Sequence, residues 1–135
     1  MAGRSWTESQ LAAINTRDRT LLVSAAAGSG KTATLTERII SSILDENDPI
    51  NIEEMLIVTY TRAAVGELRE RISKAVKKAI KERPDDQRLE KQLYMLPSAK
   101  ISTIDAFCAD TIPNSTFNKQ HMSFHTTNRT KEFPP

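Results

Sequence analysis

Cysteine, long apolar runs and a strong charge of one sign are all scarce in this chain of 135 residues. The single cysteine, Cys108, excludes an internal disulfide and fits a reducing cytoplasm. No apolar stretch reaches the roughly 18 residues that a membrane span needs, and the N-terminal residues contain no apolar run typical of a signal peptide. The net charge of +2 is too small to indicate nucleic acid by itself. We therefore expect a cytoplasmic, single-domain protein without a membrane partner.

What the chain does contain is a strand-loop-helix pattern over residues 21–32, LLVSAAAGSGKT. The apolar residues Leu21–Val23 predict a short buried strand, and a loop of small residues then leads to a helix that begins at Lys31. Gly28 and Gly30 allow the loop backbone to turn its N–H groups inward around an anion, and the helix start adds the positive end of a macrodipole. This is the order of a P-loop, whose natural ligand is a nucleoside triphosphate.

The chemistry of such a loop predicts contacts with ATP and Mg²⁺ for eight consecutive residues. They are Ala25, Ala26, Ala27, Gly28, Ser29, Gly30, Lys31 and Thr32. Lys31 would reach the β- and γ-phosphates, and the Thr32 hydroxyl would hold the Mg²⁺ ion that bridges them, so these two are the candidate catalytic residues. The match is imperfect because the usual pattern has Gly where this chain has Ala25. The alternative is a Gly-rich turn with a chance Lys-Thr pair.

Thr7 and Gln10 have the spacing of a capping box at the start of a short helix that ends near Arg17. In that role the Gln10 side chain accepts a hydrogen bond from the Thr7 backbone N–H. An amide that donates and accepts at once also suits the edge of an adenine. The spacing alone leaves both roles open.

Hydrophobic periodicity predicts five elements from the loop onward. They are a helix over Lys31–Leu44, a strand over 55–59, the longest helix from Thr61 through Lys81, a short helix ending at Pro97, and a strand over 101–104. Alternating strands and helices predict an α/β fold with a parallel sheet and right-handed crossovers.

The longest predicted helix carries seven basic residues on its polar face against only Glu67 and Glu70. The basic residues are Arg62, Arg69, Arg71, Lys74, Lys77, Lys78 and Lys81. Such a face suits a phosphate backbone, although a solvated helix face is the commoner explanation.

The apolar period ends near residue 109, so residues 109–135 are expected to form a poorly ordered tail. His121 and His125 within it are four residues apart, as two metal ligands on a helix can be. No cysteine or carboxylate stands at a matching spacing, and we therefore expect two solvated histidines.

Four segments, in the same order, resemble the first motifs of superfamily 1 DNA helicases of the UvrD/Rep type. They are Gln10, the loop Ala25–Thr32, VTYTRAAVGELRERI at 58–72 and ISTIDAF at 101–107. The wording WTESQLAAI, SAAAGSGKT and LPSAKISTI is most similar to AddA-type subunits of ATP-dependent helicase/nucleases of bacterial double-strand-break repair. The likeness covers residues 5–108.

This resemblance implies a RecA-like P-loop motor domain 1A over residues 1–108, three-layered with a short parallel sheet. It implies that Gln10 contacts adenine and that a second group of residues contacts single-stranded DNA. These are Thr59, Thr61, Arg62, Ser102 and Thr103. The implied activity is ATP hydrolysis coupled to DNA unwinding, in a protein that also has exonuclease activity. The implied partners are single-stranded DNA, the remainder of the helicase/nuclease polypeptide and a partner nuclease subunit.

The chain departs from the family pattern at three points. Ala33 stands where relatives often place an aromatic residue or an arginine beside adenine, and Asp105 stands where many have histidine and would repel phosphate. No predicted strand ends in the Asp-Glu pair of a Walker B motif, so we expect a segment that does not hydrolyse ATP alone. A catalytically inactive nucleotide-binding module and a small P-loop kinase remain as alternatives.

Overall fold

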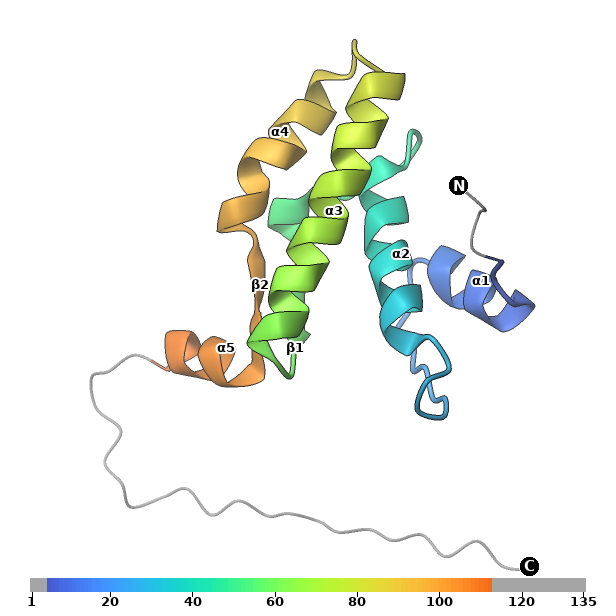
Figure 1. The fold of residues 1–135 in the computed structure, drawn as a ribbon, viewed down its shortest axis with the longest axis vertical. Helices are drawn as coiled ribbons and strands as arrows, with labels where there is room; N and C mark the ends of the chain where they lie inside the picture. The colour runs from blue at the N-terminus through green and yellow to red at the C-terminus, as the bar shows by residue number, and fades with distance from the viewer. Residues whose placement is uncertain (1–4, 113–135) are drawn as a thin grey trace, which may run out of the picture.

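The computed structural model describes residues 5–112, which form five α-helices and a two-stranded parallel sheet (Figure 1). The α-helices are α1 (Glu8–Asn15), α2 (Lys31–Leu44), α3 (Arg62–Glu82), α4 (Gln87–Met95) and α5 (Ile104–Thr111). The strands are β1 (Leu56–Thr59) and β2 (Lys100–Thr103), and the short 3₁₀ helices are η1 (Ile52–Glu54) and η2 (Leu96–Ser98). None of the helices within residues 5–112 is both long and apolar enough to cross a bilayer. The predictions for 113–135, including those for His121 and His125, lie outside the described residues.

The sheet pairs β1 with β2 in parallel, from Leu56 opposite Lys100 to Thr59 opposite Thr103. Parallel neighbours need a long crossover connection, which α3 and α4 supply here. Because the strands run in the same direction, their carboxyl ends meet at one edge of the sheet. The predicted α/β class and short parallel sheet are therefore confirmed.

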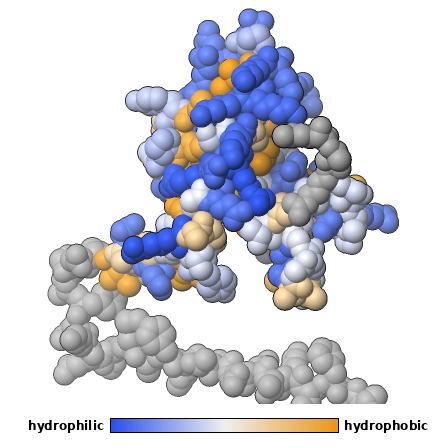
Figure 2. Space-filling model, viewed as in Figure 1, coloured by the Kyte–Doolittle hydropathy of each residue, from blue (hydrophilic) through white to orange (hydrophobic). Residues whose placement is uncertain are grey.

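The hydrophobic core lies under α3, the longest helix. Leu68, Ile72 and Val76, spaced four residues apart, form a buried stripe along this helix. They pack with Ile57 of β1 and Ile101 of β2, which point to the same face of the sheet. Figure 2 shows hydrophilic residues over the outer side of α3 and hydrophobic residues along its flanks. The amphipathic pattern thus fixes which face of the helix covers the sheet.

The predicted strand at Leu21–Val23 is wrong. These residues adopt no regular structure, all three are exposed, and Leu22 retains 92% of its accessible surface. A strand is stabilised by hydrogen bonds to a neighbouring strand and by covered faces, and an apolar triplet without a partner supplies neither. In the described part of the chain the sheet contains β1 and β2 alone, so the loop enters α2 from an irregular segment.

The other predicted elements are confirmed with shifts of one or two residues at their ends. α2 begins where the sequence predicts, and α3 begins one residue later than predicted, at Arg62. The final helix, α5, extends to Thr111 and so continues past the predicted domain boundary at residue 108. That boundary remains a prediction.

Two arginines fix α1 against α2. Arg38 of α2 donates to the carbonyl of Ala13 at 2.6 Å, and Arg17, just after α1, donates to the Ser41 hydroxyl of α2 at 3.4 Å. The last carbonyls of a helix have no partner within the helix, so a guanidinium at that end satisfies them. The consequence is that α1 lies beside the loop that precedes α2 (Figure 1).

Candidate nucleotide and nucleic-acid site

The loop before α2 turns on two glycines with left-handed backbone conformations. Gly28 has a φ of 77° and Gly30 a φ of 86°. Side-chain-bearing residues rarely adopt such angles, so these positions require glycine. A Cβ at Gly28 would meet open space, whereas one at Gly30 would lie 3.3 Å from Gln10 Nε2. Ser29 N–H donates to the Ala26 carbonyl at 3.2 Å and closes the turn.

Lys31, the first residue of α2, lies across this loop. Its Nζ donates to the carbonyls of Ala25 at 2.5 Å and Ala26 at 2.8 Å. The first N–H groups of a helix have no acceptor within the helix, so backbone donors gather beside the ammonium. The arrangement concentrates positive charge in front of an exposed loop, as an anion requires.

Thr32 is exposed in the first turn of α2, next to Lys31. Mg²⁺ in nucleotide sites is bound by few protein oxygens together with phosphate and water oxygens. Residues 5–112 contain no cluster of three or more His, Cys, Asp or Glu side chains suited to a metal. A Mg²⁺ contact through the Thr32 hydroxyl stays a prediction.

Gln10 forms the predicted capping box and also contacts the loop. Its side-chain Oε1 accepts from the Thr7 backbone N–H at 2.9 Å, and its backbone N–H donates to Thr7 Oγ1 at 3.3 Å. Its Nε2 donates to the Ser29 carbonyl at 3.2 Å. The capping prediction is confirmed, whereas contact with adenine stays a prediction.

Two hollows flank the loop. One of about 320 Å³ is lined by residues that include Gln10, Ser29 and Lys31, and the other, of about 360 Å³, includes Lys31, Thr32 and Arg38. Ligand pockets begin at roughly 300 Å³. Gln10 and Lys31, which are 21 residues apart in the sequence, therefore line the same hollow.

Arg38, in the second hollow, has a pKa below its ordinary value. Burial of its guanidinium is the larger cause, and the charge of Arg17 is the smaller one.

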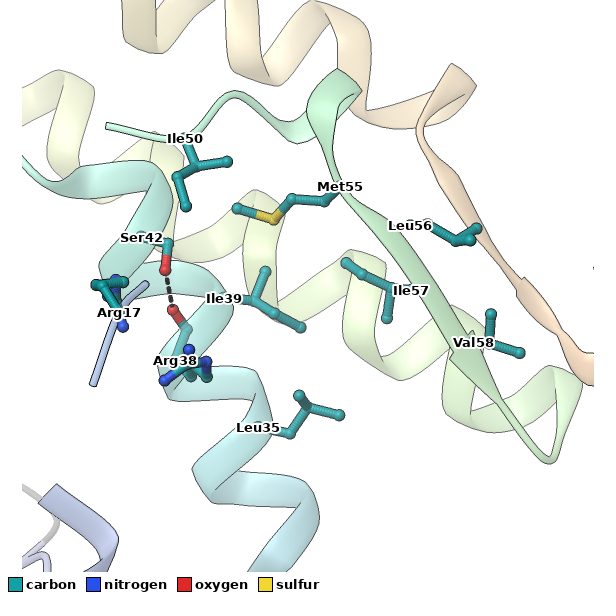
Figure 3. Close-up of a pocket in the computed structure, with 10 residues that line it drawn as sticks. All are labelled: Arg17, Leu35, Arg38, Ile39, Ser42, Ile50, Met55, Leu56, Ile57 and Val58. Carbon is teal, nitrogen blue, oxygen red and sulfur yellow. Dashed lines mark hydrogen bonds between the residues drawn. The ribbon is translucent and has the colours of Figure 1, made fainter. Parts of the chain in front are cut away.

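A further hollow of about 430 Å³ separates α2 from β1 (Figure 3). Seven of its ten lining residues are apolar side chains of α2, β1 and the segment between them. They are Leu35, Ile39, Ile50, Met55, Leu56, Ile57 and Val58. Arg17 and Arg38 lie at the side of α2 away from β1. The residues of the predicted strand at Leu21–Val23 do not line this space, and β1 pairs with β2 alone among the described residues.

The five residues predicted to bind DNA meet at the carboxyl edge of the sheet, and we call them the strand-end site. Thr59 lies opposite Thr103, and Ser102 lies one residue earlier on β2. Thr61 and Thr103 cap the helices that follow, because Thr61 Oγ1 accepts from Ala64 N–H at 3.1 Å and Thr103 Oγ1 from Ala106 N–H at 3.2 Å. Arg62, the fifth residue, is exposed at the first position of α3.

Sequence reasoning missed Tyr60, which lies between Thr59 and Thr61. Its side chain retains 89% of its accessible surface. An exposed aromatic ring is a stacking surface for an unpaired base. The available signal was an aromatic residue between polar ones directly after an apolar strand.

The basic face of α3 is largely occupied by interactions within the protein. Arg71, Lys74 and Lys78 form exposed ion pairs with Glu67, Glu70 and Glu82. The hydrogen bond and charge of Lys74 lower the pKa of Glu70. Arg69 donates to backbone carbonyls. These contacts favour a solvated face over a continuous phosphate-binding surface.

Asp105 lies in the first turn of α5 and is exposed. A carboxylate at this position interacts favourably with the positive end of the helix dipole. This gives the departure from the family pattern a structural reason, independent of any contact with phosphate.

The loop and the strand-end site adjoin each other between α2 and α3. Thr32 and Thr59 line the same small cavity, of about 30 Å³, together with Glu67 and Arg71. In Figure 1 the loop, the turn from β1 to α3 and the start of α5 lie at one end of the molecule.

With this geometry in place, the family model of the UvrD/REP helicase N-terminal domain matches residues 6–133. The chain belongs to this family of helicase domains. It is 60% identical over 114 residues to the A subunit of the ATP-dependent helicase/nuclease of Lachnoclostridium phytofermentans, in a match that covers 84% of this chain. The A subunits of the same name from Clostridium botulinum and Desulforamulus reducens are 53% and 54% identical over 85% and 82% of this chain. The chain spans only 8% or 9% of the length of these relatives.

Proposed function

We propose that this chain is the ATP-binding N-terminal segment of a DNA helicase/nuclease that acts in double-strand-break repair. Its similarity to helicase/nuclease subunits over most of its length supports the proposal. The observation that carries it is that Thr32, on the loop, and Thr59, in the strand-end site, line one small cavity. A motor needs a nucleotide site and a DNA site that adjoin, so that nucleotide binding can change the affinity for the strand.

In this proposal the residues of the loop bind MgATP. Gly28 and Gly30 shape the backbone around the phosphates, and Lys31 exchanges the carbonyls of Ala25 and Ala26 for phosphate oxygens. Thr32 holds Mg²⁺, which neutralises charge on the phosphate oxygens when bound. The remaining loop residues, Ala27 and Ser29, line the phosphates through their backbone.

Gln10 is proposed to recognise adenine from the edge of the same site. Its Nε2 already points to the loop, at the Ser29 carbonyl, while Oε1 caps α1. A side chain fixed by its own helix cap loses little freedom on binding a base. Capping and base recognition can therefore be combined in one amide.

The strand-end site is proposed to contact single-stranded DNA. Hydroxyl-bearing residues lie at this one edge, on the ends of β1 and β2 and at the starts of α3 and α5, and the Thr59 hydroxyl would exchange the Thr61 carbonyl, its acceptor at 3.2 Å, for phosphate. Arg62 supplies the charge, and Tyr60 supplies a stacking surface. Contacts of this kind bind the backbone and base faces and are tolerant of sequence.

Several wider features belong to the same proposal. They are a RecA-like three-layer motor domain 1A within residues 1–108, a cytoplasmic location, and a partner nuclease subunit. Neither described strand ends in an acidic pair, because β1 is followed by Tyr60 and β2 by Ile104. Acids that position metal and water for hydrolysis would therefore come from a part of the parent protein other than the ends of β1 and β2.

The DNA-binding half is tested by fluorescence anisotropy with a labelled single-stranded oligonucleotide and the full 135-residue chain. We expect weak binding that falls as salt rises, and a larger loss in Arg62→Ala than in Lys77→Ala with Lys78→Ala. Loss of one phosphate contact in Arg62→Ala should reduce the log–log salt slope by about 0.7.

The double variant is the matched control because it removes two charges from the far half of the same helix. Equal losses in the two proteins would indicate a diffuse basic face instead of a strand-end site. Absence of binding by the wild-type chain would refute the DNA contact altogether.

A further inference from the structure

Arg69 is the basic residue of α3 that turns away from solvent and toward the backbone. Its Nη1 donates to the carbonyls of Leu96 and of Pro97, the latter at 3.1 Å. Its Nη2 donates to the carbonyls of Ala99 at 3.0 Å and Ile101 at 3.1 Å. One guanidinium therefore binds four carbonyls along the segment that leads from η2 into β2.

This set of contacts requires an arginine. A guanidinium carries two N–H bonds on each of its two terminal nitrogens, arranged in a rigid plane, and all four have an acceptor here. A lysine presents its donors from one atom and cannot reach both pairs of carbonyls at once. Leu96, Ala99 and Ile101 are buried residues, so loss of the guanidinium removes hydrogen bonds where water has little access. The Leu96 and Ala99 carbonyls would keep the backbone N–H groups of Ala99 and Ile101 as donors.

The segment that Arg69 binds ends at the strand-end site. Ile101, the last acceptor, is followed directly by Ser102 and Thr103. The carbonyls of Ala99 and Ile101 both accept from Nη2 of Arg69, and the Ala99 carbonyl also accepts from Ile101 N–H at 2.7 Å. Arg69 thus fixes the position of β2 along α3. It also fixes the path of the backbone that continues from Ile101 to Ser102.

We infer that Arg69 is a positioning residue of the strand-end site: it places Ser102 and Thr103 beside Thr59 without contacting DNA itself. This inference rests on the proposed function, because it concerns DNA binding at that site. It separates Arg69 from Arg62, which acts by direct contact, although both belong to one basic helix face.

The test compares Arg69→Ala and Arg69→Lys with Arg83→Ala in the full chain. Arg83 is a suitable control because it also donates to a carbonyl, that of Leu44 at 3.3 Å, but at the opposite end of α3. We expect both Arg69 variants to bind single-stranded DNA about tenfold more weakly, with no rescue by lysine, and Arg83→Ala to bind like wild type.

Two further measurements distinguish positioning from general loss of stability. Amide hydrogen exchange by NMR should accelerate in β2 of the Arg69 variants while α2 stays protected. In a double-mutant cycle, Arg69→Ala should add little to the loss caused by Thr103→Val, but should add fully to that of Arg62→Ala.

The possible failures are separable. If wild type binds DNA and Arg69→Lys binds equally well, the inference is wrong while the proposed function survives. If wild type binds no DNA, the proposed function fails and the positioning role falls with it. Full additivity with Thr103→Val, or uniform acceleration of exchange throughout the chain, would reduce Arg69 to a general stabilising residue.

Discussion

Gln10 shows how one side chain can serve a helix and a ligand site. Its Oε1 and backbone N–H are used in the capping box with Thr7, and its Nε2 reaches the Ser29 carbonyl. Capping alone needs only an acceptor oxygen, whereas recognition of adenine also needs the amide donor. A substitution that keeps the oxygen and removes the donor separates the two roles.

We predict that Gln10→Glu lowers the preference for ATP over GTP by about tenfold, because the variant retains the cap and loses the amide donor. Repulsion between the added charge and the triphosphate is common to both nucleotides, so the ratio of their dissociation constants is the quantity to measure. Ser9→Ala, which changes a neighbour in the same hollow, should leave the ratio unchanged. An unchanged ratio in Gln10→Glu would leave Gln10 with the cap alone.

The contacts of Arg69 could not be predicted from the sequence. Its charge placed it on the basic face with Lys77 and Lys78, yet its acceptors lie 27 to 32 residues further along the chain. Local periodicity carries no information about contacts at that separation. The loop residues could be proposed from the sequence because their chemistry depends on adjacent positions, whereas the strand-end residues were implied only by the resemblance to UvrD/Rep-type helicases.

At the scale of elements, the turn after α2 contains an ionised group that stabilises the fold. Asp45 Oδ1 accepts from Asn47 N–H at 2.9 Å and Asp48 N–H at 3.1 Å. These hydrogen bonds lower the pKa of Asp45 below its ordinary value. The folded state therefore binds fewer protons than the unfolded state at this group, and the stabilisation is lost as pH falls through the lowered pKa.

We predict that Asp45→Asn makes the thermal unfolding midpoint less sensitive to low pH, since asparagine keeps an acceptor oxygen but does not titrate. The midpoint of thermal unfolding, followed by circular dichroism from neutral pH to below about pH 4, measures this effect. The variant should show a shallower decline on the acid side than wild type. Parallel curves would show that Asp45 contributes nothing to acid sensitivity.

Helices were easier to predict than strands in this chain. The stripe of Leu68, Ile72 and Val76 is a local repeat, and burial of that face follows from it. Leu21–Val23 has the composition of a buried strand but lacks the neighbour that would complete it among the described residues. Strand formation depends on distant partners, so composition alone was insufficient.

At the scale of the whole molecule, the candidate site lies at one end, and the hydrophobic core lies away from that end. The loop, the turn after β1 and the start of α5 lie together, while α3 and α4 pack the apolar interior away from them (Figure 1). Thr32 and Thr59 join the two halves of the site across the small cavity between α2 and α3. The proposed function as a whole requires that the loop binds nucleotide, because a DNA contact alone would not make a motor.

Titration calorimetry of MgATP with the full chain tests this requirement most directly. Lys31→Ala removes the ammonium that lies across the loop. Lys81→Ala, at an exposed position of α3, is the matched control for loss of one positive charge. We predict measurable binding by wild type and Lys81→Ala, and binding at least about tenfold weaker in Lys31→Ala because a charge-assisted contact to phosphate is lost. Equal binding by wild type and Lys31→Ala, or no binding by wild type at millimolar nucleotide, would contradict the account.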